Sequence, residues 1–196
     1  MAVALAAGTA LLGATLAVPA GSALFFGLGL LAAAAWIAGA LLSGPVPWRH
    51  ADGRSPGLVG IATPLLVGVG LFGAFVAVKL IADRVPMLSD SVASVLERAD
   101  AGSRALVLVV ALVNAVGEEM FFRGALHSAF DDRHPTASTT LIYTVVTITT
   151  LEPGLIVAAL VVGLVFSAQR RITGGVLAPI LTHVTWSTLV LFFLPR

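Results

Sequence analysis

Long apolar stretches are the feature that most limits how this chain can fold. A helix needs about 20 apolar residues to cross the hydrocarbon core of a bilayer, and the chain offers about seven stretches near that length, of which the fifth and sixth are short. We therefore expect an all-α, polytopic transmembrane helical bundle with about seven spans. The predicted spans are Ala2 to Val18, Ala20 to Leu42, Leu58 to Ala82, Leu106 to Gly124, Ala137 to Leu151, Leu155 to Gln169 and Val176 to Leu194.

The composition agrees with a membrane protein and excludes several classes of function. Of the 196 residues, 58% are hydrophobic and 11% are charged, and the mean hydropathy is +1.03, far from the balance of a soluble domain. A net charge of +1 argues against a nucleic-acid partner. The chain contains no cysteine, which removes disulfides, thiolate nucleophiles and cysteine-ligated metals from consideration.

The stretch between the third and fourth spans is polar, and part of it has the pattern of a surface helix. Apolar residues recur at helical spacing opposite charged ones, which predicts a short interfacial helix. We divide the chain there, into N-terminal helices with the interfacial linker (1–104) and a core of C-terminal helices (105–196). The apolar positions are Val92, Val95, Leu96 and Ala99, and the charged ones are Asp90, Glu97 and Arg98.

Two adjacent glutamates lie inside the fourth predicted span. A charge at the centre of a membrane helix costs about 2.5–3.5 kcal/mol on insertion scales. On a 3.6-residue helix, Glu119, Arg123 and His127 share one face, and Glu118 lies on another. Glu119 is therefore placed to pair with Arg123, whereas Glu118 has no basic partner at i+4 and is the better candidate for a general base.

A purely structural interpretation of these charges is also open. Glu119 and Arg123 could form a buried ion pair that sets helix packing, while Glu118 faces a water-filled crevice. The functional interpretation is favoured because ionisable groups inside a membrane span usually mark a functional site.

The pattern E-E-x-x-x-R-G in "GEEMFFRG" resembles the motif of the CPBP family, the type II CAAX-prenyl protease and bacteriocin-processing group of intramembrane proteases. The last span, "RRITGGVLAPILTHVTWSTL", looks like the closing segment of that family, which carries an H-x-x-x-N pattern. The resemblance covers about residues 105 to 194.

The resemblance implies a role for each residue that matches a motif. Glu118 would activate water, Glu119 and Arg123 would support the site, and His183 would stabilise the oxyanion or bind a metal. Ser187 occupies the position of the family's asparagine and can still donate one hydrogen bond.

The family's middle pattern, F-x-x-x-H, has no histidine in this chain. By spacing, Thr147 or Thr150 takes its place, and neither can act as a general base or an ordinary metal ligand. Glu118 must then work alone, unless Glu152 or His127 substitutes for the missing group.

A catalytic zinc site usually has three protein ligands and an open position. Glu118, Glu119 and His183 could make three, but Glu119 is better placed to pair with Arg123. We therefore expect no cofactor or a weakly bound divalent metal such as zinc, held, if at all, by Glu118 and His183.

These features together predict an intramembrane endopeptidase that hydrolyses a membrane-associated peptide or a CAAX-like C-terminus by a glutamate-activated water. The expected partners are the lipid bilayer and a peptide or protein substrate, and the expected location is a bacterial plasma membrane. Two alternatives stay open. The chain could be an inactive family member that acts as a membrane binding or immunity protein, or a small transporter in which the glutamates titrate.

Overall fold

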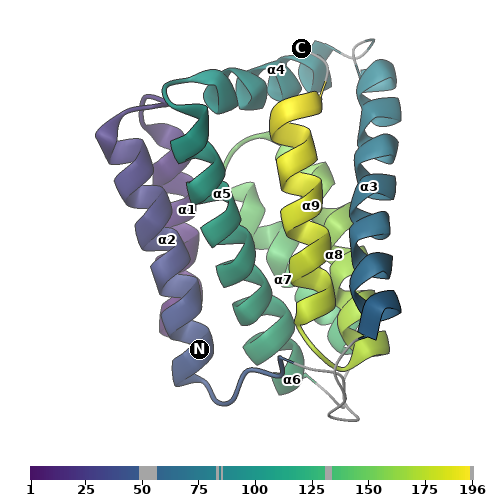
Figure 1. Cartoon of the computed structure of the whole chain (residues 1–196). Coiled ribbons are helices and arrows are strands. Elements are labelled where there is room, and N and C mark those ends of the chain that lie inside the picture. Colours follow the sequence, from purple (N-terminus) through teal and green to yellow (C-terminus); the bar gives the residue numbers. More distant parts are fainter. Residues whose placement is uncertain (49–56, 83, 85, 131–133, 195–196) are drawn as a thin grey trace.

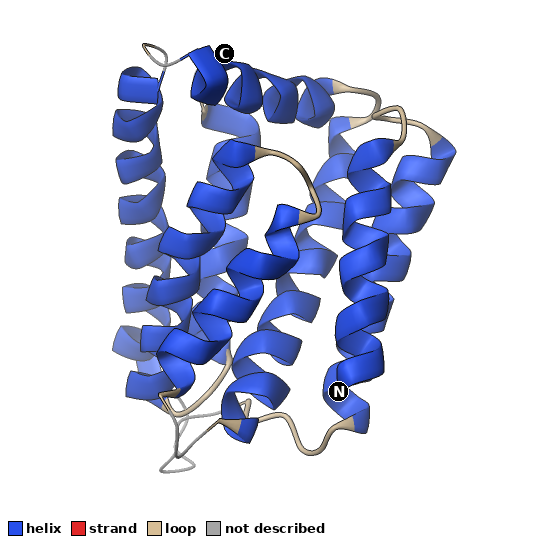
Figure 2. Ribbon diagram, turned by 180° about the vertical axis from the view of Figure 1, so that it is seen from behind, coloured by secondary structure: helices blue, strands red, loops and turns tan. Residues whose placement is uncertain are grey.

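The computed structural model describes residues 1–48, 57–82, 84, 86–130 and 134–194, and within these ranges it contains helices and no strand (Figure 2). The elements are α1 (Ala2–Ala17), α2 (Ala23–Leu42), α3 (Gly57–Ala82), α4 (Pro86–Asp100), α5 (Arg104–Glu118), a π-helix η1 (Glu119–Leu126), α6 (His127–Ala129), α7 (Pro135–Ile148), α8 (Pro153–Thr173) and α9 (Leu177–Phe193).

The helices form a bundle in which most elements run side by side and α4 lies across one end (Figure 1). The main packing pairs are α1 with α2, α2 with α5, α3 with α9, and α7 with α8. The α5–η1–α6 segment is continuous and contacts α2, α7, α8 and α9. Residues 119–124, at the end of the fourth predicted span, are therefore buried inside the bundle, where they meet side chains from several other helices.

The chain is an integral membrane protein, but the expected count of about seven spans is not confirmed. In the described part of the chain, four helices are long and apolar enough to cross a bilayer: Ala23–Leu42, Gly57–Leu80, Arg104–Ala129 and Pro153–Thr173. Helices α1 and α9 are apolar but shorter, with 16 and 17 residues. Helix α7 has 14 residues, so at 1.5 Å per residue it spans about 21 Å, less than a hydrocarbon core of about 30 Å.

Helix α4 is the element that the linker pattern predicts. Leu96 and Ser91 are buried, whereas Asp90 and Glu97 are exposed, so the helix presents one face to the bundle. Glu152, in the turn before α8, accepts hydrogen bonds from the Oγ atoms of Ser91 (3.0 Å) and Ser94 (2.8 Å). These two bonds attach α4 to the α7–α8 turn.

The helix that carries the two glutamates changes its winding at that point. It is an α-helix as far as Glu118 and a π-helix from Glu119 to Leu126. The 3.6-residue geometry expected for this segment is therefore wrong after Glu118. Wider π turns are rare and occur often at functional sites, and here the change of winding comes between the two adjacent carboxylates.

Candidate active site

Glu119 is the centre of a buried ionic cluster. Its side chain is fully buried, and its Oε1 atom lies 3.2 Å from Nη1 of Arg123 and 3.0 Å from Nδ1 of His183. Arg123 is one π turn away in η1, and His183 comes from the middle of α9. The cluster therefore fixes α9 against the α5–η1 segment, and it brings together three of the residues that the two sequence motifs contain.

Arg123 is fully buried and is contacted by residues of several helices, although its Nε atom has no hydrogen-bond partner among the described residues. Its Nη2 atom donates to the carbonyl oxygen of Gly163 in α8 at 3.3 Å. Its guanidinium carbon lies 4.6 Å from the ring centre of Tyr143 and 5.4 Å from that of Phe166. Stacking on aromatic rings and the carboxylate of Glu119 compensate the loss of water around the charge.

Glu118 occupies a different environment from its neighbour. Its side chain is partly exposed, and Oε2 accepts a hydrogen bond of 2.7 Å from the Tyr143 hydroxyl in α7. No basic side chain forms an ion pair with Glu118 among the described residues. Glu118 therefore keeps one oxygen that no described residue engages, which is the arrangement a general base needs.

A cavity of about 230 Å³ opens beside Glu118. Both Glu118 and His183 line it, and since Nδ1 of His183 is bound to Glu119, Nε2 is the ring nitrogen left for the cavity. Glu119 and Arg123 do not line the cavity, and they contact it only through His183 and their other neighbours. The cavity is lined by Leu12, Ala111, Asn114, Ala115, Glu118, Tyr143, Thr147, Thr150, Leu155, Ala158, Ala159, Val162, His183, Trp186 and Ser187.

The remaining motif positions also reach this cavity. Ser187 lies one turn after His183 in α9 and lines the cavity. Thr147 of α7 and Thr150, in the turn after α7, line it as well. Each threonine donates its hydroxyl proton to a backbone carbonyl of its own segment, to that of Tyr143 at 2.9 Å and to that of Thr147 at 2.7 Å. Their hydroxyl oxygens can accept a hydrogen bond from a ligand, but their protons are already engaged.

Neither possible substitute for the missing histidine lies at the cavity. Glu152 does not line the cavity. Its two carboxylate oxygens instead accept hydrogen bonds from Ser91 and Ser94 of α4. His127 is buried at the end of η1 and is not a lining residue either. The structure therefore brings Glu118, Glu119, Arg123, His183, Ser187, Thr147 and Thr150 together and leaves these two residues apart.

The donors at the cavity do not fit a three-ligand zinc site. Within the described ranges, no group of three or more His, Asp or Glu side chains is placed to hold a metal ion. Glu119 Oε1 is already shared by Arg123 and His183, and so only Glu118 and Nε2 of His183 remain for a metal.

The sequence alone does not show the importance of three cavity residues. Tyr143 lies one turn before Thr147 in α7, and its hydroxyl donates a hydrogen bond to Glu118. Asn114 donates both amide protons to the carbonyl oxygens of Gly29 and Val110 at 2.9 Å. The ring of Trp186 meets that of Phe75 edge to face, with their centres 5.0 Å apart. The one signal available beforehand is spacing, since Asn114 precedes Glu118 by one turn and Trp186 follows His183 by three residues.

Residues 100–189 match the family model of type II CAAX prenyl endopeptidase Rce1-like proteins. No curated protein and no solved structure matches the chain. The matched segment includes both motifs and every cavity-lining residue except Leu12. The resemblance to the CPBP family is confirmed over residues 100–189, a little under half of the chain, where the sequence matches the Rce1-like, type II CAAX prenyl endopeptidase model.

Proposed function

We propose that the chain is an intramembrane endopeptidase in which Glu118 activates a water molecule. The family is one of proteases, and the observation that carries the proposal is the cavity shared by Glu118 and His183, behind which Glu119 and Arg123 form a buried support. A general base, space for water and donors for an oxyanion are the groups that peptide hydrolysis needs.

In the first step, Glu118 removes a proton from water while the water oxygen attacks the peptide carbonyl carbon. The tetrahedral intermediate carries its negative charge on the former carbonyl oxygen. In the second step, Glu118 returns the proton to the leaving nitrogen and the C–N bond breaks, which yields a carboxylic acid and an amine. The acid then loses its proton to water or to the released amine. The Tyr143 hydroxyl holds one oxygen of Glu118, so the other oxygen handles the proton in both steps.

His183 supplies the oxyanion donor when both of its ring nitrogens carry protons. An ionised Glu119 can only accept a hydrogen bond, so Nδ1 of His183, at 3.0 Å, must be the donor in that contact. Nε2–H then exists only in the imidazolium form. That form balances the cluster, since Glu118 and Glu119 carry two negative charges and Arg123 and His183 two positive charges. The Ser187 hydroxyl is the second donor to the oxyanion.

The substrate in this proposal is a membrane-associated peptide or a CAAX-like C-terminus, and the protein works in the plasma membrane of a bacterium with no nucleic-acid partner. We propose that no tightly bound metal takes part, because only Glu118 and His183 remain as ligands at the cavity. Cleavage should therefore survive extended dialysis against a metal chelator. Loss of cleavage on dialysis, with recovery on adding zinc, would contradict the metal-free mechanism.

The test of the function is cleavage of a peptide library by the purified chain reconstituted in liposomes. Glu118→Gln should lower kcat by about a thousandfold or more, because the amide cannot take a proton. Glu152→Gln is the matched control, since it makes the same change at a glutamate outside the cavity, and it should retain cleavage. The protease function is wrong if the wild-type protein cleaves no peptide or if Glu118→Gln cleaves as fast as wild type.

One observation favours a second candidate function. Helix α7 and the turn after it supply two threonines and no imidazole to the cavity, and both threonine protons are bonded to backbone carbonyls. An inactive family member, acting as a membrane binding protein or an immunity protein, would bind a membrane peptide in the same cavity and would not hydrolyse it. That protein would bind library peptides and cleave none of them. A transporter would instead show a proton or solute flux in liposomes that Glu118→Gln abolishes.

A further inference from the structure

A second cavity lies at the end of the bundle that α4 crosses, and it shares no lining residue with the cavity beside Glu118. Its volume is about 490 Å³, within the range of about 300–1,000 Å³ that is common for small-ligand sites. It is lined by Ala17, Val18, Pro19, Ala20, Ser94, Glu97, Arg98 and Ala101. One wall is thus the α1–α2 turn, and the other is the C-terminal half of α4.

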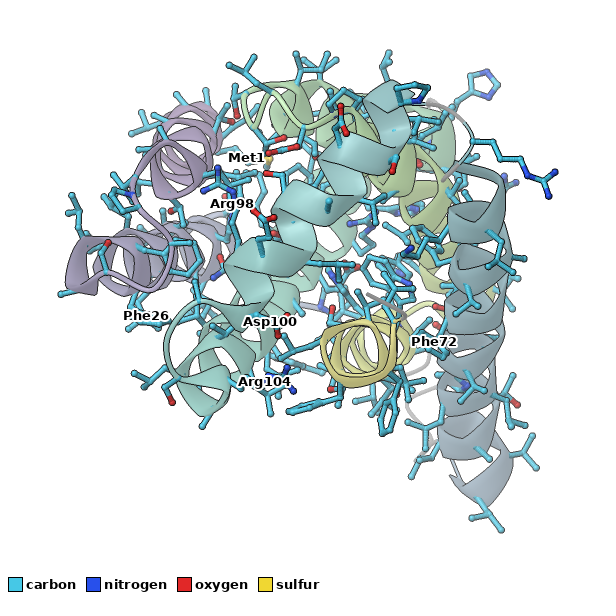
Figure 3. All side chains as sticks on the ribbon, turned by 90° about the horizontal axis from the view of Figure 1, so that it is seen from above. Met1, Phe26, Phe72, Arg98, Asp100 and Arg104 are labelled. Carbon is cyan, nitrogen blue, oxygen red and sulfur yellow. The ribbon has the colours of Figure 1, made fainter. Side chains whose placement is uncertain are left out.

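Arg98 is the cationic residue of this cavity, and among the described residues its guanidinium forms no ion pair. The side chain is half-buried, and its Nε atom is buried without a hydrogen-bond partner among the described residues. Figure 3 shows Arg98 between α4 and the neighbouring N-terminal helices. By contrast, Arg104 at the same end of the bundle is exposed and pairs with Asp100 at 2.8 Å. A half-buried guanidinium without an anionic partner is costly, and an anion in the cavity would remove that cost.

The place of the cavity and its walls indicate which anion it takes. Helix α2, which is long and apolar enough to span a bilayer, begins at Ala23, directly after the α1–α2 turn. If α2 spans the bilayer, the cavity lies where that span ends, at the depth of lipid headgroups. Its turn wall consists of Ala, Val and Pro side chains. An apolar wall beside a guanidinium fits a phosphodiester attached to glycerol better than it fits a free ion.

The hydrogen-bond acceptors in the cavity indicate which kind of lipid headgroup it binds. The carboxylate of Glu97 and the hydroxyl oxygen of Ser94 both line it, and the Ser94 proton is already donated to Glu152. Both groups can accept hydrogen bonds from a ligand. We propose that this cavity binds the headgroup of a phospholipid whose phosphate pairs with Arg98 and whose headgroup carries a hydrogen-bond donor, such as an ammonium, directed to Glu97.

The test is lipid binding to the purified full chain in detergent, followed by native mass spectrometry during titration with phosphatidylethanolamine. Arg98→Gln should weaken binding about tenfold or more, as expected when a charged hydrogen-bond partner is lost. Arg104→Gln removes an arginine at the same end of the bundle and should bind as wild type does. Arg98→Lys keeps the charge and should recover part of the affinity. Equal binding by Arg98→Gln and wild type would overturn the proposal.

Two further arms of the titration test the kind of ligand. Phosphatidylcholine has no donor in its headgroup and should bind more weakly than phosphatidylethanolamine, and Glu97→Gln should reduce that difference. Inorganic phosphate should not displace the lipid at equal concentration. Equal binding of the two lipids to wild type would overturn the role of Glu97, and displacement by inorganic phosphate would identify a free-anion site instead. None of these outcomes depends on peptide cleavage.

Discussion

At the scale of single residues, the two adjacent glutamates differ because of their neighbours. Glu119 is fully buried and engaged by Arg123 and His183. Glu118 is partly exposed and held through one oxygen by Tyr143. Two identical side chains one position apart therefore have different roles. Glu119 supports the site, and Glu118 is the candidate base, because α7 and α9 bring different groups to them.

The Glu119–Arg123 pair is predicted to be strongly coupled. Glu119→Gln leaves the buried guanidinium without its counter-charge and should lower the free energy of unfolding by about 3–5 kcal/mol. Arg123→Met should have a similar effect. The double variant should lose less than the sum of the two, because it removes the guanidinium together with its counter-charge. Thermal unfolding in detergent gives the stability of the wild type, the two single variants and the double variant. Additive losses of stability would contradict the coupling.

The Tyr143 hydroxyl can be tested separately from the Tyr143 ring. Tyr143→Phe keeps the ring under the Arg123 guanidinium but removes the hydrogen bond to Glu118. We expect kcat for peptide cleavage to fall about ten- to a hundredfold, as for the loss of a hydrogen bond to a charged group, with the thermal midpoint little changed. A kcat equal to that of wild type would show that this hydroxyl does not orient Glu118.

At the scale of elements, the site depends on close contacts between helices. Helix α9 carries His183 and packs along α3, and the approach is tight at Gly68. A Cβ atom added there would lie 2.8 Å from Cβ of Thr185 and 2.9 Å from the carbonyl oxygen of Thr182. In the same helix, a Cβ atom at Gly73 would meet no atom within 4 Å.

These two glycines form a matched pair of variants. Gly68→Ala should destabilise the protein by about 1–3 kcal/mol, as overpacking does, and it should lower cleavage because α9 shifts together with His183. Gly73→Ala should leave both stability and cleavage near wild type. Thermal unfolding in detergent and the liposome cleavage assay measure the two effects. Equal behaviour of the two variants would contradict the close α3–α9 contact.

At the scale of the whole molecule, the helices place their ends at two faces of the bundle (Figure 1). Asp90 is exposed on α4 at one end, and Arg171 is exposed near the C-terminal end of α8 at the other. If α8 spans the membrane, these two residues lie on opposite sides of it.

The natural absence of cysteine makes this arrangement easy to test. In sealed vesicles, a membrane-impermeant maleimide should label only one of the single variants Asp90→Cys and Arg171→Cys. After permeabilisation it should label both. Labelling of both variants in sealed vesicles would show that the α8 end and α4 face the same side, and α8 would then not be a spanning helix.

The sequence by itself determined the class of fold, the interfacial pattern of α4, the pairing of Glu119 with Arg123, and the family. These features depend on apolar length and on local spacing, both of which can be read along the chain. The division at residues 104 and 105 stays a prediction. The sequence also does not show which glycine of the third span lies in a close helix contact. Gly68 differs from Gly73 only through its contacts with α9.

Only the tertiary structure decided how many helices are long enough to span, that the segment after Glu118 winds as a π-helix, and which groups meet at the cavity. His183 binds Glu119 through Nδ1 across 64 residues of sequence, and Tyr143 reaches Glu118 across 25. Contacts at such separations depend on how the helices pack, and one-dimensional periodicity carries no information about that packing. The physical reason is that burial and hydrogen bonding are set by neighbours from other helices. The same packing leaves the buried Nε atom of Arg98 without a hydrogen-bond partner among the described residues.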